Sequence, residues 1–430
     1  MRRIDERRRD VDPERSWHPT RRTVLNSAAA FGILGGVSGA SATALAQEED
    51  DDEQPVGFDP GTVRVARGDV AYISIAFEDD EEATLIVGSE EVNYVVQMDV
   101  HDGDGDGTVT VALNTAVAGW QDEHGYSTVD EADEVRDVTQ ETEQLNGPLE
   151  AATYQLRLYV DDERVDVGQL VLEERETRGI LAGIAPREAL PGADFLDWVV
   201  EREEVAQGDW AVFGVGATGI FGTVSSWADL RDDENGLVME FERTAEHNLP
   251  AEEVQITDGL FGADEENDRF FVAVDTEQLE VDRTYEATFR VTADYPIAAQ
   301  RLAEAMRRER IDADELDDDE RAELRSAVEE SVAASVTVLE RTVDFDVEND
   351  ELSVTQGEET ISGTTTVAPG SELLFTVTST TGTPFVDSET AEVGDDGTWE
   401  IAADFSDIES GTEFIVEIDD PSESIEGTVE

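Results

Sequence analysis

The chain contains no cysteine and no lysine, and each absence excludes a class of structure or function. Without cysteine there are no disulfides, no thiolate metal site and no lipid-modified cysteine to serve as an anchor. Without lysine there is no phosphate-binding loop of the P-loop type. Only 29 basic residues face 105 acidic ones, a formal net charge of −76. Because phosphate binding needs a basic face, we expect no nucleic-acid partner.

The excess of negative charge also indicates the solvent in which the protein folds. Self-repulsion of this size strains a compact fold at ordinary ionic strength. Molar salt shortens the screening length to about 3 Å and removes most of that repulsion, so the composition favours an extreme halophile. High net charge is also typical of disordered chains. Apolar residues nevertheless make up 39% of the sequence and alternate in strand-like segments, which predicts a folded protein.

Residues 1–46 are predicted to be an export signal. Arg21 and Arg22 precede an apolar run rich in alanine and glycine, which ends in a small-x-small sequence at Ala46. The paired arginines indicate the twin-arginine route, which carries folded proteins. An uncleaved membrane anchor is the alternative, but the run is weakly apolar and short for a spanning helix. We expect cleavage before Gln47, a mature chain without a transmembrane helix, and a place outside the cell or on its surface.

The mature chain is predicted to begin with an acidic linker, 47–55, and a β-rich domain, 56–185. Val70–Phe77 shows the alternation of a half-buried strand, since every second side chain from Ala71 on is apolar. One helix is expected in this domain, over residues 130–145. It is suggested by the helical spacing of Val135, Val138 and Leu145.

The rest of the chain is predicted to form two further β domains, 192–350 and 351–430. In the middle domain, the glycine-interrupted apolar run 210–224 indicates a tight hairpin or close backbone packing. The spacing of apolar residues then changes to that of helices, which predicts a helical hairpin over 297–333. The chain is expected to return as a strand over 336–345. The last domain has short strands every 8–12 residues, as in a β-sandwich. The expected fold is therefore mainly β: tandem β-sandwich (Ig-like) domains with a helical hairpin inserted in the middle one.

An acidic loop is the one candidate metal site. Asp102, Asp104 and Asp106 alternate with glycines, as in the first half of an EF-hand loop, which binds calcium through oxygen ligands. The twelfth position is Leu113 where an EF-hand needs glutamate, and a strand is expected to begin at Thr108. The loop is therefore not an EF-hand. It is either a calcium-binding hairpin loop or a solvated acidic turn.

The sequence contains none of the common catalytic motifs, and no enzyme is expected. The histidines of the mature chain, His101, His124 and His247, are far apart and in polar surroundings, and neither a zinc-binding His-Glu-x-x-His nor a Gly-x-Ser-x-Gly sequence occurs. Carboxylate pairs are too frequent here to indicate a glycosidase. No cofactor besides calcium is expected. The tryptophans could stack on sugars or pack in the core; they are Trp120, Trp198, Trp210, Trp227 and Trp399.

Several segments resemble the S-layer (major cell-surface) glycoproteins of haloarchaea. In the first domain they are 63–69, 92–94 and 166–168, and in the last domain 361–370 resembles the BGTF-type surface domain of that family. The resemblance implies stacked β domains with a structural role at the cell surface and no catalysis. The partners it implies are cell-envelope or S-layer proteins, including other copies of this chain.

The sequence departs from that family in two ways. The family usually ends in a threonine-rich spacer, a Pro-Gly-Phe sorting signal and a membrane helix, and it is typically N-glycosylated. Here the sequence ends at Gly427–Glu430, and no Asn-x-Ser/Thr sequon occurs. We therefore expect a secreted relative attached peripherally to the surface. The alternatives are a secreted calcium-assisted adhesin or carbohydrate-binding protein and, third, a glycan-processing enzyme.

The charge analysis predicts that folding depends on salt. Circular dichroism should show β structure in molar KCl, and this signal should be lost on dialysis into dilute buffer, because the carboxylates then repel one another over longer distances. A spectrum that is unchanged by dialysis would contradict the assignment to a halophile.

Overall fold

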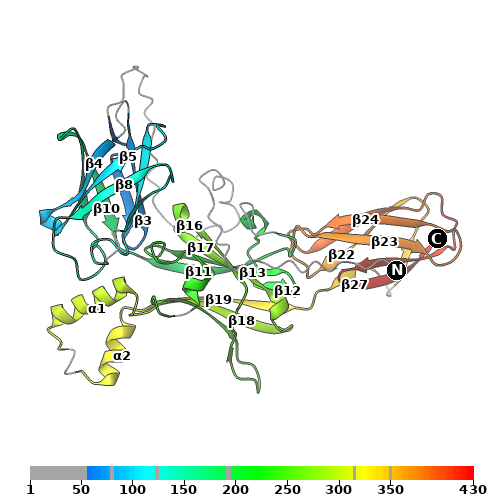
Figure 1. The fold of residues 1–430 in the computed structure, drawn as a ribbon. Coiled ribbons are helices and arrows are strands. Elements are labelled where there is room, and N and C mark those ends of the chain that lie inside the picture. The colour runs from blue at the N-terminus through cyan, green and yellow to red at the C-terminus, as the bar shows by residue number, and fades with distance from the viewer. Residues whose placement is uncertain are drawn as a thin grey trace, which may run out of the picture.

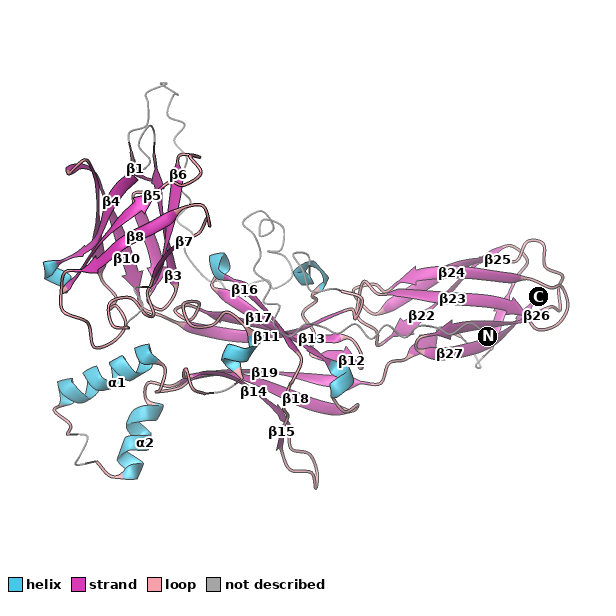
Figure 2. Ribbon diagram, viewed as in Figure 1, coloured by secondary structure: helices cyan, strands magenta, loops and turns pink. Residues whose placement is uncertain are grey.

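The computed structural model is composed mostly of strands, which form three domains that follow one another along the chain (Figure 1, Figure 2). The predicted signal, 1–46, with Arg21, Arg22 and the Ala46–Gln47 bond, lies outside the described residues, as do the linker 47–55 and His124. The structure describes residues 56–77, 82–121, 125–189, 195–231, 233–312, 316–347 and 351–430.

The first domain packs a four-stranded sheet, in the order β1-β3-β6-β7, against a six-stranded sheet, β2-β10-β9-β4-β5-β8. Alternate side chains of the central strands, such as Ile73, Leu85 and Val111, are fully buried between the sheets. The elements are β1 (Gly57–Phe58), β2 (Thr62–Ala66), β3 (Val70–Ala76), β4 (Glu82–Ser89), η2 (Glu90–Val92), β5 (Tyr94–His101), β6 (Thr108–Asn114), β7 (Tyr126–Thr128), β8 (Glu134–Gln140), β9 (Thr153–Val160) and β10 (Glu163–Glu173).

The middle domain has the sheets β11-β13-β17-β16 and β12-β19-β18-β14-β15. Its core is rich in aromatic rings, among them Phe213, Phe270 and Phe289. Its strands and short helices are β11 (Thr177–Ala185), η3 (Phe195–Trp198), β12 (Glu204–Ala206), β13 (Trp210–Ala217), η4 (Trp227–Leu230), β14 (Leu237–Arg243), β15 (Glu252–Glu253), β16 (Gly259–Asp264), η5 (Glu265–Asn267), β17 (Arg269–Asp275), η6 (Thr276–Gln278), β18 (Arg283–Val291) and β19 (Glu330–Leu339).

A helical hairpin connects β18 to β19 and lies beside the first domain (Figure 1). Helix α1 (Pro296–Glu309) starts at a proline, whose fixed φ suits the first helical turn, and ends where Arg310 adopts a left-handed conformation. Helix α2 (Asp318–Ser326) starts with a capping box, in which Asp317 and Glu320 bond each other's backbone N–H groups. None of the helices in the described parts of the chain has the length and apolar content needed to cross a bilayer.

The third domain pairs the sheet β20-β22-β25 with the sheet β21-β27-β26-β23-β24. Trp399 and Phe375 stack at its centre with ring centroids 4.3 Å apart. The strands are β20 (Val343–Phe345), β21 (Leu352–Val354), β22 (Glu358–Thr365), β23 (Glu372–Ser379), β24 (Val386–Glu392), β25 (Thr398–Asp404), β26 (Glu413–Asp419) and β27 (Ser422–Val429).

All three domains share one strand pairing. A short second strand (β2, β12 or β21) pairs in parallel with the last strand of its domain (β10, β19 or β27). In the middle domain, one sheet has the order A-B-E-D of an immunoglobulin domain, and the other contains strands C, F and G. The predicted fold class, tandem Ig-like β-sandwiches with a helical hairpin in the middle domain, is confirmed.

The helix predicted over residues 130–145 is wrong, because the centre of that segment, Glu134–Gln140, is strand β8 and no helix is found there. A bulge separates the pairs Gln97–Thr139 and Asp99–Arg136, and Asp137 adopts a left-handed conformation there. The extra residue lets Val135 and Val138 both pack against the core although they are three positions apart. A bulged strand therefore produced the spacing of a helix.

The domain boundaries also differ from those predicted. Strand β11 pairs with β13, so residues 177–185 belong to the middle domain and not to the first. Strand β20 pairs with β22, which assigns residues 343–345 to the third domain. Strand β19 already begins at Glu330, so the helical hairpin is shorter than the predicted 297–333. In each case the segment lies close to a domain boundary in the sequence, and only its pairing within a sheet shows which domain it belongs to.

Candidate functional site

The junction between the first and middle domains is built on the turn 67–69, which joins β2 to β3. Asp69 in this turn is buried, and its carboxylate accepts three backbone N–H groups of the middle domain. The donors are Gly219 at 2.7 Å, Ile220 at 2.8 Å and Phe221 at 2.9 Å. Hydrogen bonds to an ionised acceptor are roughly twice as strong as neutral ones. One carboxylate therefore holds two domains together.

The turn is fixed on the side of the first domain by Thr115. Its hydroxyl accepts the N–H of Gly68 at 2.7 Å and donates to the carbonyl of Asp69 at 2.7 Å. Gly68 has φ +99°, and a Cβ at this position would collide with the carbonyl of Gly219. Glycine is required here both by the backbone conformation and by the close approach of the middle domain.

Ion pairs surround this junction. Arg67 and Arg301 both pair with Glu174, at 3.6 and 3.1 Å, while Arg301 and Arg175 both pair with Glu330, at 3.2 and 2.7 Å. Burial acts to raise the pKa of Glu330, but Arg175, Thr177 and Arg301 together hold that pKa below its ordinary value. Since Arg301 lies on α1, the network also fastens the helical hairpin to the junction.

Burial raises the pKa of Asp69 to about 6, although the N–H groups of Gly219, Phe221 and Ile220 act in the opposite direction. At neutral pH the carboxylate is therefore ionised, as its three donors require. Tyr295 adds a further hydrogen bond across the site, from its hydroxyl to the carbonyl of Gly219.

The junction between the middle and third domains repeats the same device. Asp209 lies in the turn between β12 and β13 and is fully buried. Its carboxylate accepts the backbone N–H of Ala368, in the third domain, at 2.8 Å, and the guanidinium of Arg341 at 2.8 Å. The hydroxyl of Thr276 accepts the N–H of Gly208 and donates to the backbone carbonyl of Asp209, as Thr115 does with Gly68 and Asp69 in the first junction. Burial raises the pKa of Asp209 in spite of Arg341.

Sequence reasoning missed these junction residues, although a signal was present. The five residues 65–69, Val-Ala-Arg-Gly-Asp, recur with one change at 205–209, Val-Ala-Gln-Gly-Asp. A Gly-Asp pair repeated after two equivalent strands indicates a turn with one repeated task. The glycine-interrupted run 210–224, predicted to pack its backbone closely, supplies the N–H groups that Asp69 bonds.

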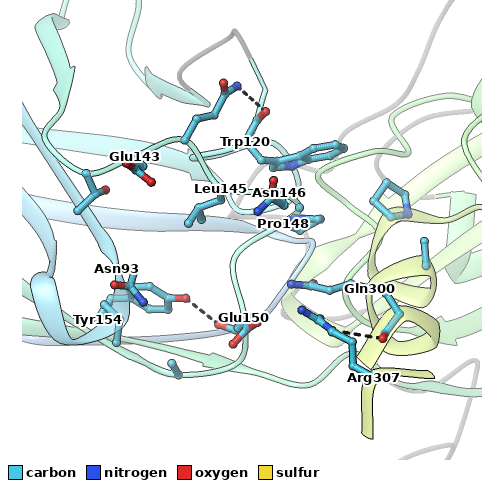
Figure 3. A pocket seen from close by; sticks show the side chains of 18 of the residues that line it. Asn93, Trp120, Glu143, Leu145, Asn146, Pro148, Glu150, Tyr154, Gln300 and Arg307 are labelled. Atoms are coloured by element: carbon cyan, nitrogen blue, oxygen red, sulfur yellow. Dashed lines mark hydrogen bonds between the residues drawn. The ribbon is translucent and has the colours of Figure 1, made fainter. Parts of the chain in front are cut away.

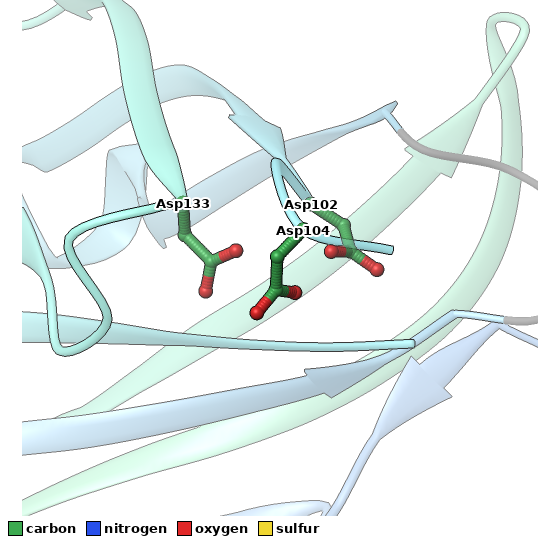
Figure 4. Close-up of side chains that lie close together, drawn as sticks. All are labelled: Asp102, Asp104 and Asp133. Carbon is green, nitrogen blue, oxygen red and sulfur yellow. The ribbon is translucent and has the colours of Figure 1, made fainter. Parts of the chain in front are cut away.

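The structure brings two of the three predicted loop carboxylates together and adds another. Asp102, Asp104 and Asp133 each offer an oxygen within 4.8 Å of the other two (Figure 4). Asp106 is outside this group and accepts the N–H of Thr108 instead. Asp133 precedes β8, in the segment for which a helix was predicted, and therefore could not be foreseen.

The loop is held by its own backbone. The carboxylate of Asp102 accepts the N–H groups of Gly105 and Gly107, each at 2.8 Å, and Asp133 accepts that of Gly103 at 3.2 Å. Burial would raise the pKa of Asp102, but the two glycine N–H groups bring it below its ordinary value. Burial, together with the charge of Asp102, raises the pKa of Asp133. The carboxylate of Asp104 is exposed and completes the cluster at its open side.

A cleft of about 1200 Å³ lies between the first domain and α1 (Figure 3). Trp120, Leu145 and Tyr154 line one wall, and Gln300 and Arg307 line the other. The indole N–H of Trp120 donates to the carbonyl of Ala116, so the one hydrogen-bond donor of this side chain is used within its own domain.

Among the described residues, the histidines and tryptophans named in the sequence do not gather in one site. His101 ends β5 beside Glu82, at 3.6 Å, and His247 is exposed in the middle domain. Trp227 and Trp399 are buried core residues, while Trp120 lines the cleft. Trp198 is 45% exposed beside Gly370, and Trp210 packs on Phe195.

Comparison with known proteins gives relatives of one kind. The cell surface glycoprotein 2 of Haloarcula hispanica is 28% identical over 85% of this chain and 43% of its own length. The cell surface glycoprotein of Haloferax gibbonsii is 28% identical over 79% of this chain and 40% of its own length. The chain is similar to haloarchaeal cell surface glycoproteins over most of its length. The predicted resemblance is thereby confirmed, and the chain spans less than half the length of these curated relatives.

Two further comparisons add little about function. Residues 48–161 match a domain of unknown function, DUF7827. Among solved structures, the I-band fragment I67–I69 of titin is 10% identical and covers 87% of this chain and 95% of its own, with a TM-score of 0.19. A tetra-tandem repeat of a large adhesion protein is 14% identical and covers 87% of this chain and 73% of its own, with a TM-score of 0.18. Scores this low do not establish a shared arrangement.

The first junction predicts a specific loss of interdomain coupling. Asp69→Ala leaves three buried N–H groups without an acceptor and should weaken the coupling between the first two domains by about 3 kcal/mol or more. Calorimetry in molar KCl should show one shared transition of the two domains separating into two.

Asp166→Ala is the matched control, because Asp166 accepts the N–H groups of Phe58 and Val167 entirely within the first domain. It should lower the stability of that domain without separating the transitions. If Asp69→Ala leaves a single transition at the wild-type temperature, Asp69 does not couple the domains.

Proposed function

We propose that the chain is a non-enzymatic structural protein of the cell surface of an extremely halophilic archaeon, exported through the twin-arginine route and held on the envelope peripherally. Its work is contact with envelope or S-layer proteins, including other copies of itself. The observation that carries this proposal is the pair of buried junctions, at Asp69 and Asp209, which connect three Ig-like domains end to end. A chain of fixed domains is suited to spacing and contact, and less to substrate turnover.

Three further observations support the proposal. The relatives, which align with 79–89% of this chain, are named as cell surface glycoproteins. The formal charge of −76 suits concentrated salt. Within the described residues, His101 ends a strand of the first domain and His247 lies in the middle domain, so the two do not share a site.

A second function, calcium-assisted adhesion or carbohydrate binding, is favoured by the cluster of Asp102, Asp104 and Asp133. Calcium takes six to eight oxygen ligands at 2.3–2.6 Å, and three carboxylates that converge at one loop are a suitable partial set. A bound cation would also relieve the repulsion from neighbouring carboxylates, which adds to burial in raising the pKa of Asp133. Calcium would then stabilise the first domain without taking part in a reaction.

The calcium hypothesis predicts stabilisation that depends on Asp104 and Asp133. At free calcium of about one hundred times Kd, the wild-type first domain should gain about 2.7 kcal/mol. Asp104→Asn with Asp133→Asn should remove that gain, measured as the shift of the melting temperature between calcium and chelator in molar KCl. Asp106→Asn is the matched control and should keep the full shift. Equal shifts in both variants would exclude the cluster as the site.

The surface assignment predicts the location of the mature protein. Antibody should label it on intact cells in brine, and its N-terminus should begin at Gln47 by mass spectrometry. Since attachment is proposed to be peripheral, chelator or lowered salt should release it without detergent. Confinement of the protein to the cytoplasm, or an intact Arg21–Arg22 pair, would contradict the proposal.

A further inference from the structure

Helix α1 is a positively charged element of a strongly acidic protein. With its C-terminal cap it carries four arginines, Arg301, Arg307, Arg308 and Arg310, against Glu304 and Glu309. Cations at a helix C-terminus are also favoured by the helix dipole. The charge therefore concentrates at the end of α1 that is remote from the junction.

The arginines at this end have no carboxylate partner in the described part of the molecule. Arg307, Arg308 and Arg310 are all exposed, and no ion pair within 4.0 Å joins them to a described residue. Arg301, nearer the start of the helix, pairs with Glu174 and Glu330. Guanidinium groups that remain unpaired among so many carboxylates are available to a partner.

The third domain has the complementary charge. Residues 351–430 contain 20 acidic residues and no arginine, lysine or histidine. Among the described residues of this domain, Asp420 is the one carboxylate in an ion pair, with Arg187 and Arg341 at the second junction. An arginine from outside would meet attraction there without competition from resident bases.

One face of the third domain also exposes apolar side chains. Leu374 on β23 is 57% exposed, and Val386 on β24 is 69% exposed. Both belong to the outer face of the five-stranded sheet, where the exposed Glu372 and Glu392 lie directly opposite each other. Like charges in that position destabilise a strand pair, and a guanidinium between them would relieve the repulsion.

We propose that the arginine-rich end of α1 in one copy binds the outer face of the β23–β24 hairpin in the third domain of a second copy. Arg308 and Arg310 would meet Glu372 and Glu392, and their methylene stems would cover Leu374. Molar salt screens charges beyond about 3 Å, so only direct contacts of this kind keep their attraction. This inference rests on the proposed surface function and names the partner as the chain itself.

The two surfaces lie at opposite ends of the molecule, so they cannot meet within one copy (Figure 1). A contact between two different surfaces is heterologous, and it continues into rings or open chains of molecules. Such growth is what an assembly spread over a cell surface needs.

The test is self-association of the mature chain in molar KCl, measured by sedimentation velocity over a range of concentrations. Arg308→Glu with Arg310→Glu should raise the dissociation constant about tenfold or more. Adding Glu372→Arg with Glu392→Arg to that same chain should restore association, because the charges are then exchanged across the contact. The matched control is Arg164→Glu with Arg231→Glu, two exposed arginines elsewhere, which should change the constant by less than about twofold.

A wild-type chain that stays monomeric, an arginine variant that associates like the wild type, a control variant weakened as much, or a failure of the exchanged chain to recover would each overturn the inference. Antibody labelling of intact cells that express the same variants separates this result from the proposed function. Surface labelling with unchanged association rejects the α1 contact alone.

Discussion

The architecture depends on a buried carboxylate that is bonded by the backbone of the next domain. Asp69 accepts three N–H groups from the middle domain, and Asp209 accepts one from the third domain together with Arg341. A buried charge is tolerated only where donors replace the water that it loses. Each aspartate is therefore stable only while the neighbouring domain is in place, and this makes separation of the domains costly.

The third domain shows which parts of this device are specific to a junction. Its turn 356–358 keeps the glycine, with φ +142°, but Glu358 replaces the aspartate and is exposed. Phe405 follows β25, at the place where Thr115 follows β6 and Thr276 follows β17. No described atom lies within 4 Å of a Cβ placed on Gly357. The glycine thus belongs to the Ig-like topology, whereas the aspartate and the threonine belong to the junction.

Alternation and turn residues predicted most of the fold, because each strand buries one face within its own domain. The half-buried strand at Val70 and the short strands of the third domain were found in this way. The bulge in β8 was hidden, since Val135 and Val138 imitate a helix. Two of the three carboxylates of the acidic cluster, Asp102 and Asp104, were visible because they are two positions apart in the sequence. Asp133 joins the cluster from a segment far from it in the chain, so no local pattern specifies it. The junction aspartates carry a repeated Gly-Asp signal at 68–69 and 208–209, but their partners in the next domain are set by the tertiary fold.

Five of the arginines form ion pairs where domains meet. In the first junction Arg67, Arg175 and Arg301 pair with two glutamates, and in the second Arg187 and Arg341 pair with Asp420. Concentrated salt weakens exposed ion pairs, but it weakens buried ones much less. An arginine in a buried ion pair at a junction therefore still stabilises the contact in concentrated salt, where exposed ion pairs contribute little. The same reasoning applies to the exposed arginines of α1. An unpaired guanidinium forms its strongest ion pair where a second surface can bury it.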